Sequence, residues 1–112
     1  MSGFALLAAM AASIVAQPVP RATLQSLVSP DDYPAAARAQ GLTGTTRVAL
    51  TVGPNGRVSA CHVLASSGAQ VLDSATCRLL SSRARFTPAM DSTGNPAEAT
   101  VEASLAWPPP AR

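Results

Sequence analysis

His62 is the only histidine among the 112 residues, so any histidine-based catalytic site must use it. Ser66, Ser67 and Asp73 follow it closely in the sequence, and Cys61 precedes it. A catalytic triad requires a nucleophile within hydrogen-bond reach of the imidazole. Adjacent residues of a strand point to opposite faces of the sheet, so the side chains of Cys61 and His62 diverge. We therefore predict that the chain is not an enzyme and that His62 is a solvated or partly covered strand residue.

The two cysteines, Cys61 and Cys77, favour a disulfide. An even number of cysteines in an exported chain is typical of disulfide pairing, and the closed loop of about 16 residues would contribute about 3 kcal/mol. The alternative is a pair of unbonded cysteines buried as small hydrophobic residues. A metal site is less favoured, because the sequence has one histidine, no Cys-x-x-Cys motif and no acidic cluster nearby. We expect no metal and no cofactor.

The composition indicates one small folded domain that binds neither nucleic acid nor a small molecule. Hydrophobic residues make up 47% of the chain, and its net charge of +2 comes from eight basic residues and six acidic ones. The basic residues are all arginines, interspersed with acids, and form no stripe that would bind nucleic acid. The glycine-containing segments 41–44 and 53–56 fit no phosphate-binding fingerprint and are typical of turns.

The start of the chain predicts export. The apolar run 4–15 is too short to cross a hydrocarbon core of about 30 Å, but its length suits a secretory signal. Small residues near Ser13 and Ala16 would support cleavage, so we expect a signal peptide at 1–16. The alternative is a truncated transmembrane anchor whose true start lies upstream; with the resemblance described below, it would lie in the inner membrane and face the periplasm.

The interior of the chain predicts a single domain at residues 31–107. Prolines flank it on both sides, and we expect a linker at 17–30 and a proline-rich tail at 108–112. Helical periodicity, strand alternation and turn residues give the order α-β-β-α-β. The expected elements are a helix at 35–40, strands at 45–52 and 57–64, a helix at 69–83 and a strand at 97–107.

This order predicts an α+β fold with two helices packed on one face of a three-stranded antiparallel sheet. A right-handed crossover from the second strand through the second helix places the third strand beside the first. The spatial order is then 2-1-3, which leaves the third strand at an exposed edge.

Short motifs follow one another in a definite order over residues 30–107. They are Tyr33-Pro34, Gly41 and Gly44, Gly56, Ser67-Gly68, Leu72-Asp73, and Phe86 with Pro88. In this order the chain resembles the C-terminal domain of TonB-family energy transducers. Cys61 and Cys77 are similar to the cysteines of a subgroup of that family with a strand-to-helix disulfide.

The resemblance implies a periplasmic domain that binds a partner. In the family, a short N-terminal segment of an outer-membrane TonB-dependent receptor adds to the sheet at the last strand. Main-chain hydrogen bonds give such a complex its affinity, and alternate side chains give its selectivity. Carried over to this sequence, the partner-binding edge consists of Ala97, Glu98, Ala99, Thr100, Val101, Glu102, Ala103, Ser104 and Leu105.

Two features of the family's transducers bear on how this chain would work. Such transducers have a membrane anchor and a long proline-rich spacer, whereas residues 17–31 reach only about 45 to 55 Å when fully extended. We therefore expect a stand-alone docking or modulating domain in receptor-dependent transport. The alternatives are a full transducer that has lost its anchor, and a structural or assembly domain that pairs its edges as a homodimer.

Overall fold

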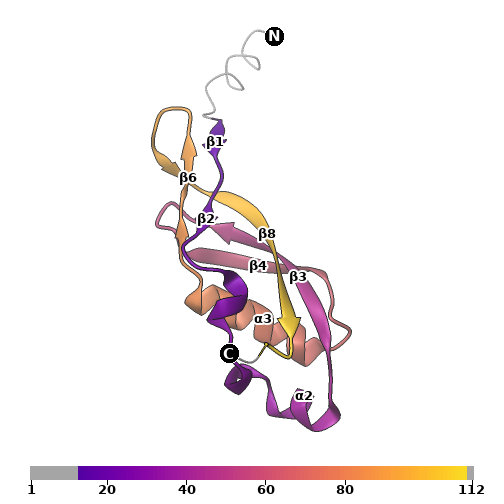
Figure 1. Cartoon of the computed structure of the whole chain (residues 1–112). Helices are drawn as coiled ribbons and strands as arrows, with labels where there is room; N and C mark the ends of the chain where they lie inside the picture. Colours follow the sequence, from indigo (N-terminus) through magenta and orange to yellow (C-terminus); the bar gives the residue numbers. More distant parts are fainter. Residues whose placement is uncertain (1–12, 111–112) are drawn as a thin grey trace, which may run out of the picture.

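A computed structural model describes residues 13–110 and has a mixed α+β architecture whose main sheet has three antiparallel strands (Figure 1). Its strands are β3 (Gly44–Val52), β4 (Val58–Ala65) and β8 (Ala99–Trp107), in the spatial order β4–β3–β8. The predicted order 2-1-3 is therefore confirmed. β3 lies in the middle and pairs with β8 along its whole length, from Gly44 opposite Trp107 to Val52 opposite Ala99.

Strand alternation explains why β3 forms the centre of the sheet. Thr46, Val48, Leu50 and Val52 all point to one face and are completely buried. The turn that follows closes with hydrogen bonds from the Gly53 N–H to the Arg57 carbonyl and from the Gly56 N–H to the Gly53 carbonyl, both 2.9 Å. The hairpin predicted from the sequence forms with nearly the expected bounds.

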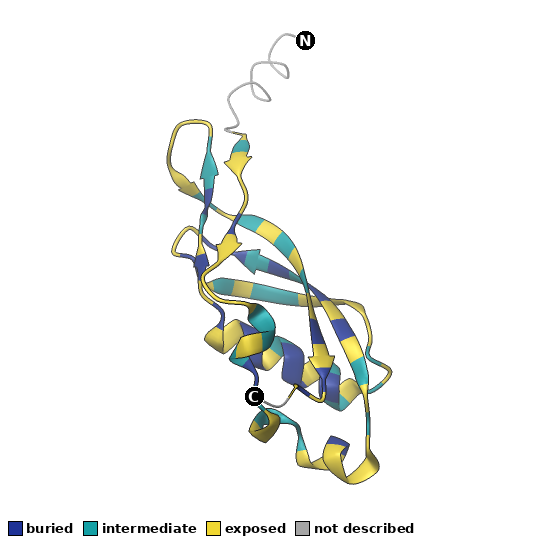
Figure 2. Cartoon of the chain, viewed as in Figure 1, coloured by how far each residue is buried: buried dark blue, intermediate teal, exposed yellow. Residues whose placement is uncertain are grey.

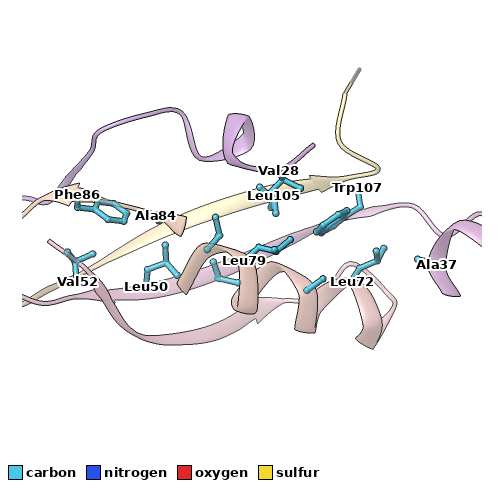
Figure 3. Packing of buried hydrophobic residues seen from close by; sticks show 13 residues of the cluster. Val28, Ala37, Leu50, Val52, Leu72, Leu79, Ala84, Phe86, Leu105 and Trp107 are labelled. Carbon is cyan, nitrogen blue, oxygen red and sulfur yellow. The ribbon is translucent and has the colours of Figure 1, made fainter. Parts of the chain in front are cut away.

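α3 (Gln70–Arg83) covers the buried face of the sheet (Figures 1 and 2). Its buried residues recur at helical spacing and meet the strands in one core (Figure 3). Phe86, just beyond the helix, is 1% exposed and closes one end of this core. The buried residues of α3 are Leu72, Ala75, Thr76, Leu79 and Leu80.

The packing of the first helix differs from the prediction. α2 (Ala35–Gln40) does not share the sheet face with α3 but lies at the end of the sheet where β3 begins (Figure 1). It has only six residues, of which Ala37 is buried, so it has no apolar stripe wide enough to cover strands. Gly41 ends the helix in the left-handed region at φ 62°, as expected of a glycine at this position.

The structure contains short strands that the sequence analysis did not predict. β1 (Ile14–Ala16), β6 (Ala89–Asp91) and β7 (Pro96–Ala97) form one small sheet, and β2 (Val19–Pro20) pairs with β5 (Phe86–Thr87). The prediction of three strands was therefore too low. The strand expected at 97–107 is also interrupted, because Ala97 pairs with Ala89 in β6 rather than with β3.

The segment expected to be a linker, residues 17–30, packs against the domain. It contains β2 and the 3-10 turn η1 (Leu24–Leu27), and a second turn, η2 (Pro30–Asp32), follows. Val28 is 1% exposed, and Leu24 and Leu27 also pack against the core. The apolar residues of this segment join the core through a turn that sequence periodicity does not reveal.

The two ends of the chain are described only in part. Most of the predicted signal segment, 1–16, lies outside the described residues, although Ile14 and Ala16 pair with β6. In the predicted tail, Pro109 is buried. No helix within residues 13–110 is long and apolar enough to cross a membrane.

Candidate functional site

The side chains of Cys61 and His62 lie on opposite faces of β4, as strand geometry requires. Cys61 forms a disulfide with Cys77 of α3, with a Cα–Cα distance of 5.7 Å, so the predicted disulfide is confirmed. His62 is exposed and stands opposite Ala49 of β3. The disulfide links α3 to β4, the edge strand on the side of the sheet away from β8.

The serines near His62 bond to Asp73. Asp73 Oδ1 accepts hydrogen bonds from Thr46 Oγ1 at 2.8 Å, and from the N–H and Oγ of Ser67 at 2.9 and 2.8 Å. Asp73 Oδ2 accepts from Ser66 Oγ at 2.5 Å. Burial raises the pKa of this carboxyl, but the hydrogen bonds from Ser66, Ser67 and Thr46 outweigh burial and lower the pKa to about 2. The charged carboxylate of Asp73 thus links α3 to β3 and to the β4–α3 loop through hydrogen bonds.

Tyr33 holds the start of the domain against the end of the sheet. Its hydroxyl donates to the carbonyl of Leu42 and lies 3.3 Å from that of Ala37. Its ring stacks on Trp107 of β8 at a centroid distance of 6.3 Å, and the Arg38 guanidinium lies 5.2 Å from its centroid. Pro34 is the N-cap residue of α2. The Tyr33-Pro34 motif therefore has a structural role.

Two motif glycines are required by close backbone approaches. A Cβ atom on Gly44 would collide with the Ser67 carbonyl, and one on Gly56 would collide with the Phe86 carbonyl. Gly56 also has φ 80°, a region that side chains disfavour, and its own carbonyl accepts a 2.9 Å hydrogen bond from the Phe86 N–H. Pro88 lies beside the same turn. The remaining motif residues, Gly68 at φ 100° and the fully buried Leu72, also shape the backbone or the core.

The outer edge of β8 carries backbone groups that point away from β3. The N–H of Ala106 donates to Gln25 Oε1 at 2.8 Å, and its carbonyl accepts from Gln25 Nε2 at 3.2 Å. Because the direction of these groups alternates along a strand, those of Thr100, Glu102 and Ser104 also face outward. We call Thr100, Glu102, Ser104 and Ala106 the outer residues of β8. Among residues 13–110, no strand pairs with this edge.

The outer edge differs in extent from the predicted partner-binding edge. Ala97 belongs to β7 and Glu98 lies between the two strands, so the sheet edge begins at Ala99. The side chains of Val101 and Ala103 are half-buried and pack against the core, whereas those of the outer residues are exposed. Glu102 forms an ion pair with Arg47 on the face opposite α3.

The chain matches one family model over most of its length. The family described as Gram-negative bacterial TonB protein C-terminal matches residues 29–108. The chain belongs to this family. A comparison with curated proteins finds no match. TonB C-terminal domains are energy-transducer domains of the Gram-negative envelope that interact with outer-membrane receptors, and they are not a known enzyme family. The family implies a role in TonB-dependent transport.

Sequence reasoning missed two residues that shape the surroundings of the edge in this TonB domain. One is Gln25. The other is Arg83, which makes hydrogen bonds of 2.7 and 2.8 Å to the Asp32 carboxylate and one of 2.8 Å to the Leu27 carbonyl. The hydrogen bonds from Arg83 and Ser29 hold the pKa of Asp32 well below its usual range, and Asp32 raises the pKa of Arg83. Neither residue forms a local motif, because its partners are distant in sequence.

Proposed function

We propose that this TonB domain binds an extended N-terminal segment of an outer-membrane receptor along the outer edge of β8. The observation that carries the proposal is the set of outward-facing N–H and C=O groups at Thr100, Glu102 and Ser104, beside which no strand lies within residues 13–110. An added strand satisfies these groups by main-chain hydrogen bonds, the mode called β-augmentation.

The side chains beside the edge support a binding site with two chemically different faces. On the α3 side, Val101 and Ala103 are half-buried and offer apolar contacts to alternate residues of the added strand. On the other side, the exposed ion pair of Glu102 with Arg47 offers charge. Backbone bonding would supply most of the affinity, and these faces would supply selectivity.

The proposed setting is the periplasm. The family's place in the Gram-negative envelope supports it, as does the disulfide, which is typical of oxidising compartments. The domain would reach the periplasm through the signal predicted at 1–16, or would face it from an inner-membrane anchor. Its contribution there is docking of the receptor segment, which modulates or couples receptor-dependent transport.

A pair of proline variants tests the proposal. The Ser104 N–H faces outward, so Ser104→Pro removes a donor from the docking edge without breaking the β3–β8 ladder. The matched control is Val63→Pro, because by the same alternation the Val63 N–H faces outward from β4, at the opposite edge.

Affinity is measured by fluorescence anisotropy with synthetic peptides from the N-terminal segments of outer-membrane receptors of the same organism. Ser104→Pro is expected to weaken binding by about tenfold, because at least one main-chain hydrogen bond is lost, while Val63→Pro binds like the parent protein. Circular dichroism checks that both variants fold. Equal affinity of folded Ser104→Pro and the parent, or a loss confined to Val63→Pro, would contradict docking at β8.

The other edge of the sheet favours a second candidate, self-association as a homodimer. Val63 and Leu64 at the end of β4 are 43% and 47% exposed, and a register shift in the β3–β4 pairing lies beside them. Antiparallel pairing of two β4 strands would cover these side chains. Sedimentation that depends on protein concentration, and that Val63→Pro abolishes, would support this candidate; a monomer at all concentrations would exclude it.

A further inference from the structure

The side chain of Gln25 forms hydrogen bonds with the backbone of Ala106, the last outer residue of β8. Its amide donates to the Ala106 carbonyl at 3.2 Å and accepts from the Ala106 N–H at 2.8 Å. One residue of a neighbouring antiparallel strand would form the same two bonds with Ala106. A primary amide reproduces this pattern because it carries both a carbonyl oxygen and N–H donors. Gln25 therefore stands where an added strand would otherwise continue.

The turn that carries Gln25 is held by its own hydrogen bonds and by contacts with the rest of the domain. At its two ends, the Ser26 N–H donates to the Thr23 carbonyl at 2.9 Å and the Val28 N–H donates to the Gln25 carbonyl at 3.3 Å. Leu27 packs against the core, and its carbonyl accepts a 2.8 Å hydrogen bond from Arg83 Nη1. The backbone of Gln25 is thus held in place before any partner arrives.

We propose that Gln25 is a specificity-determining residue that sets the length of the docked strand. The inference rests on the docking function proposed above. Gln25 closes Ala106 to a partner strand, because it bonds to both backbone groups of that residue. The outer residues whose N–H and C=O groups remain available are Thr100, Glu102 and Ser104. An added strand can then pair with a stretch of about five residues of β8, or about 17 Å at the rise of an extended chain. Pairing beyond Ser104 requires displacement of the Gln25 amide.

This closure defines the chemistry of the segment that fits. The segment needs about five consecutive residues that can be extended, with no proline at the positions whose N–H groups face β8. Beyond the residue opposite Ser104, the chain must leave the sheet, so proline or glycine is tolerated there. A short extended stretch followed by a turn residue matches the edge better than a long uninterrupted strand.

Amide hydrogen exchange measured by NMR tests the closure without any partner. In the full exported chain, the Ala106 amide is expected to be protected, whereas those of Thr100, Glu102 and Ser104 exchange freely. In Gln25→Ala, exchange at Ala106 is expected to accelerate by about tenfold, because its acceptor is gone. Leu105 and Trp107, whose N–H groups face β3, should remain protected in both proteins and show that the strand is intact.

The matched control is Gln40→Ala, which truncates an exposed glutamine in α2 and should leave the exchange at Ala106 unchanged. An unprotected Ala106 amide in the parent protein would overturn the closure. Equal protection in the parent and in Gln25→Ala would overturn it as well.

A series of receptor N-terminal peptides of increasing length tests the consequence for docking. With the parent protein, affinity should stop rising once the peptide covers Thr100 to Ser104. With Gln25→Ala, peptides longer by two residues should bind about threefold to tenfold more tightly than the shorter ones, because Ala106 becomes available. Equal gains for both proteins would overturn the specificity role.

The two arms separate this inference from the function on which it rests. If no peptide binds either protein, the docking function is refuted and the specificity role falls with it, while Ala106 exchange still shows whether Gln25 closes the edge. If peptides bind both proteins with the same length dependence, docking stands and the role of Gln25 is refuted.

Discussion

Replacing Asp73 by asparagine tests the account of how the β4–α3 loop is held. The carboxylate accepts hydrogen bonds from Thr46 Oγ1, the Ser67 N–H, and the hydroxyls of Ser66 and Ser67. An asparagine side chain has one carbonyl oxygen and carries N–H donors on the other branch. The variant therefore loses the negative charge, and its side-chain N–H groups face donors from which a carboxylate oxygen accepted hydrogen bonds.

The lowered pKa of Asp73 sets the magnitude. A fall from the ordinary 3.8 to about 2 corresponds to about 2 kcal/mol if the site were fully shielded from water. The side chain is half-buried, so solvent screening reduces this contribution to about 1 kcal/mol. Since the folded-state pKa is the lower one, this stabilisation is complete above the unfolded-state pKa. It is lost as the pH falls from about 4 through about 2.

The assay is urea unfolding of the parent and of Asp73→Asn at about pH 7 and about pH 2. We expect the variant to be less stable by about 1 to 2 kcal/mol at neutral pH, and the difference to shrink by about 1 kcal/mol in acid. Asp31→Asn, which alters an exposed carboxylate in η2, is the matched control and should differ little from the parent. A loss for Asp73→Asn that is the same at both pH values would refute the role of its charge.

Two further changes test the parts of the domain that support the edge. The Cys61→Ala/Cys77→Ala variant opens a loop with a sequence separation of 16, and chemical denaturation should show a loss of about 3 kcal/mol. Intact mass of the parent protein purified without reductant should lie about two daltons below that of its reduced form, and equal masses would contradict the disulfide. Gly56→Ala should cost at least about 2 kcal/mol in the same assay, because its Cβ would meet the Phe86 carbonyl at φ 80°; parent-like stability would contradict that close approach.

The features that the sequence predicted correctly are local or follow from strand alternation. The alternation of Val48, Leu50 and Val52 and the glycine-bounded turn define the β3–β4 hairpin within a short stretch of chain. Helical spacing in α3 and opposite faces for Cys61 and His62 also follow from the period of one element. The strand order followed from the handedness of one crossover.

The features that the sequence did not predict depend on contacts between distant segments. α2 follows the expected bounds, yet its position at the sheet end depends on Tyr33 stacking against Trp107. Residues 17–30 have the prolines of a linker, but Val28 is buried in the core, Leu27 packs against it, and η1 contacts the distant elements β8 and α3. Gln25 and Ala106 are 81 residues apart in the sequence, and no local sequence pattern indicates their contact.

The candidate edge was predicted as a strand but not as a set of outward groups. Which backbone groups of β8 face the free edge depends on its register with β3, and alternation alone leaves two choices. The Gln25 hydrogen bonds to Ala106 decide between them. The sequence pattern also predicted that Ala97 belongs to the strand that forms β8, although Ala97 pairs with Ala89 in a separate hairpin.

Amide exchange on the isotope-labelled chain, with and without a receptor N-terminal peptide, tests the docking of that segment at β8 most directly. If the segment docks at β8, a bound peptide slows exchange at Thr100, Glu102 and Ser104 and leaves the outward amides of β4, at Cys61 and Val63, unaffected. Slowing at Cys61 and Val63 instead, or no slowing at β8 when the peptide is bound, would contradict it.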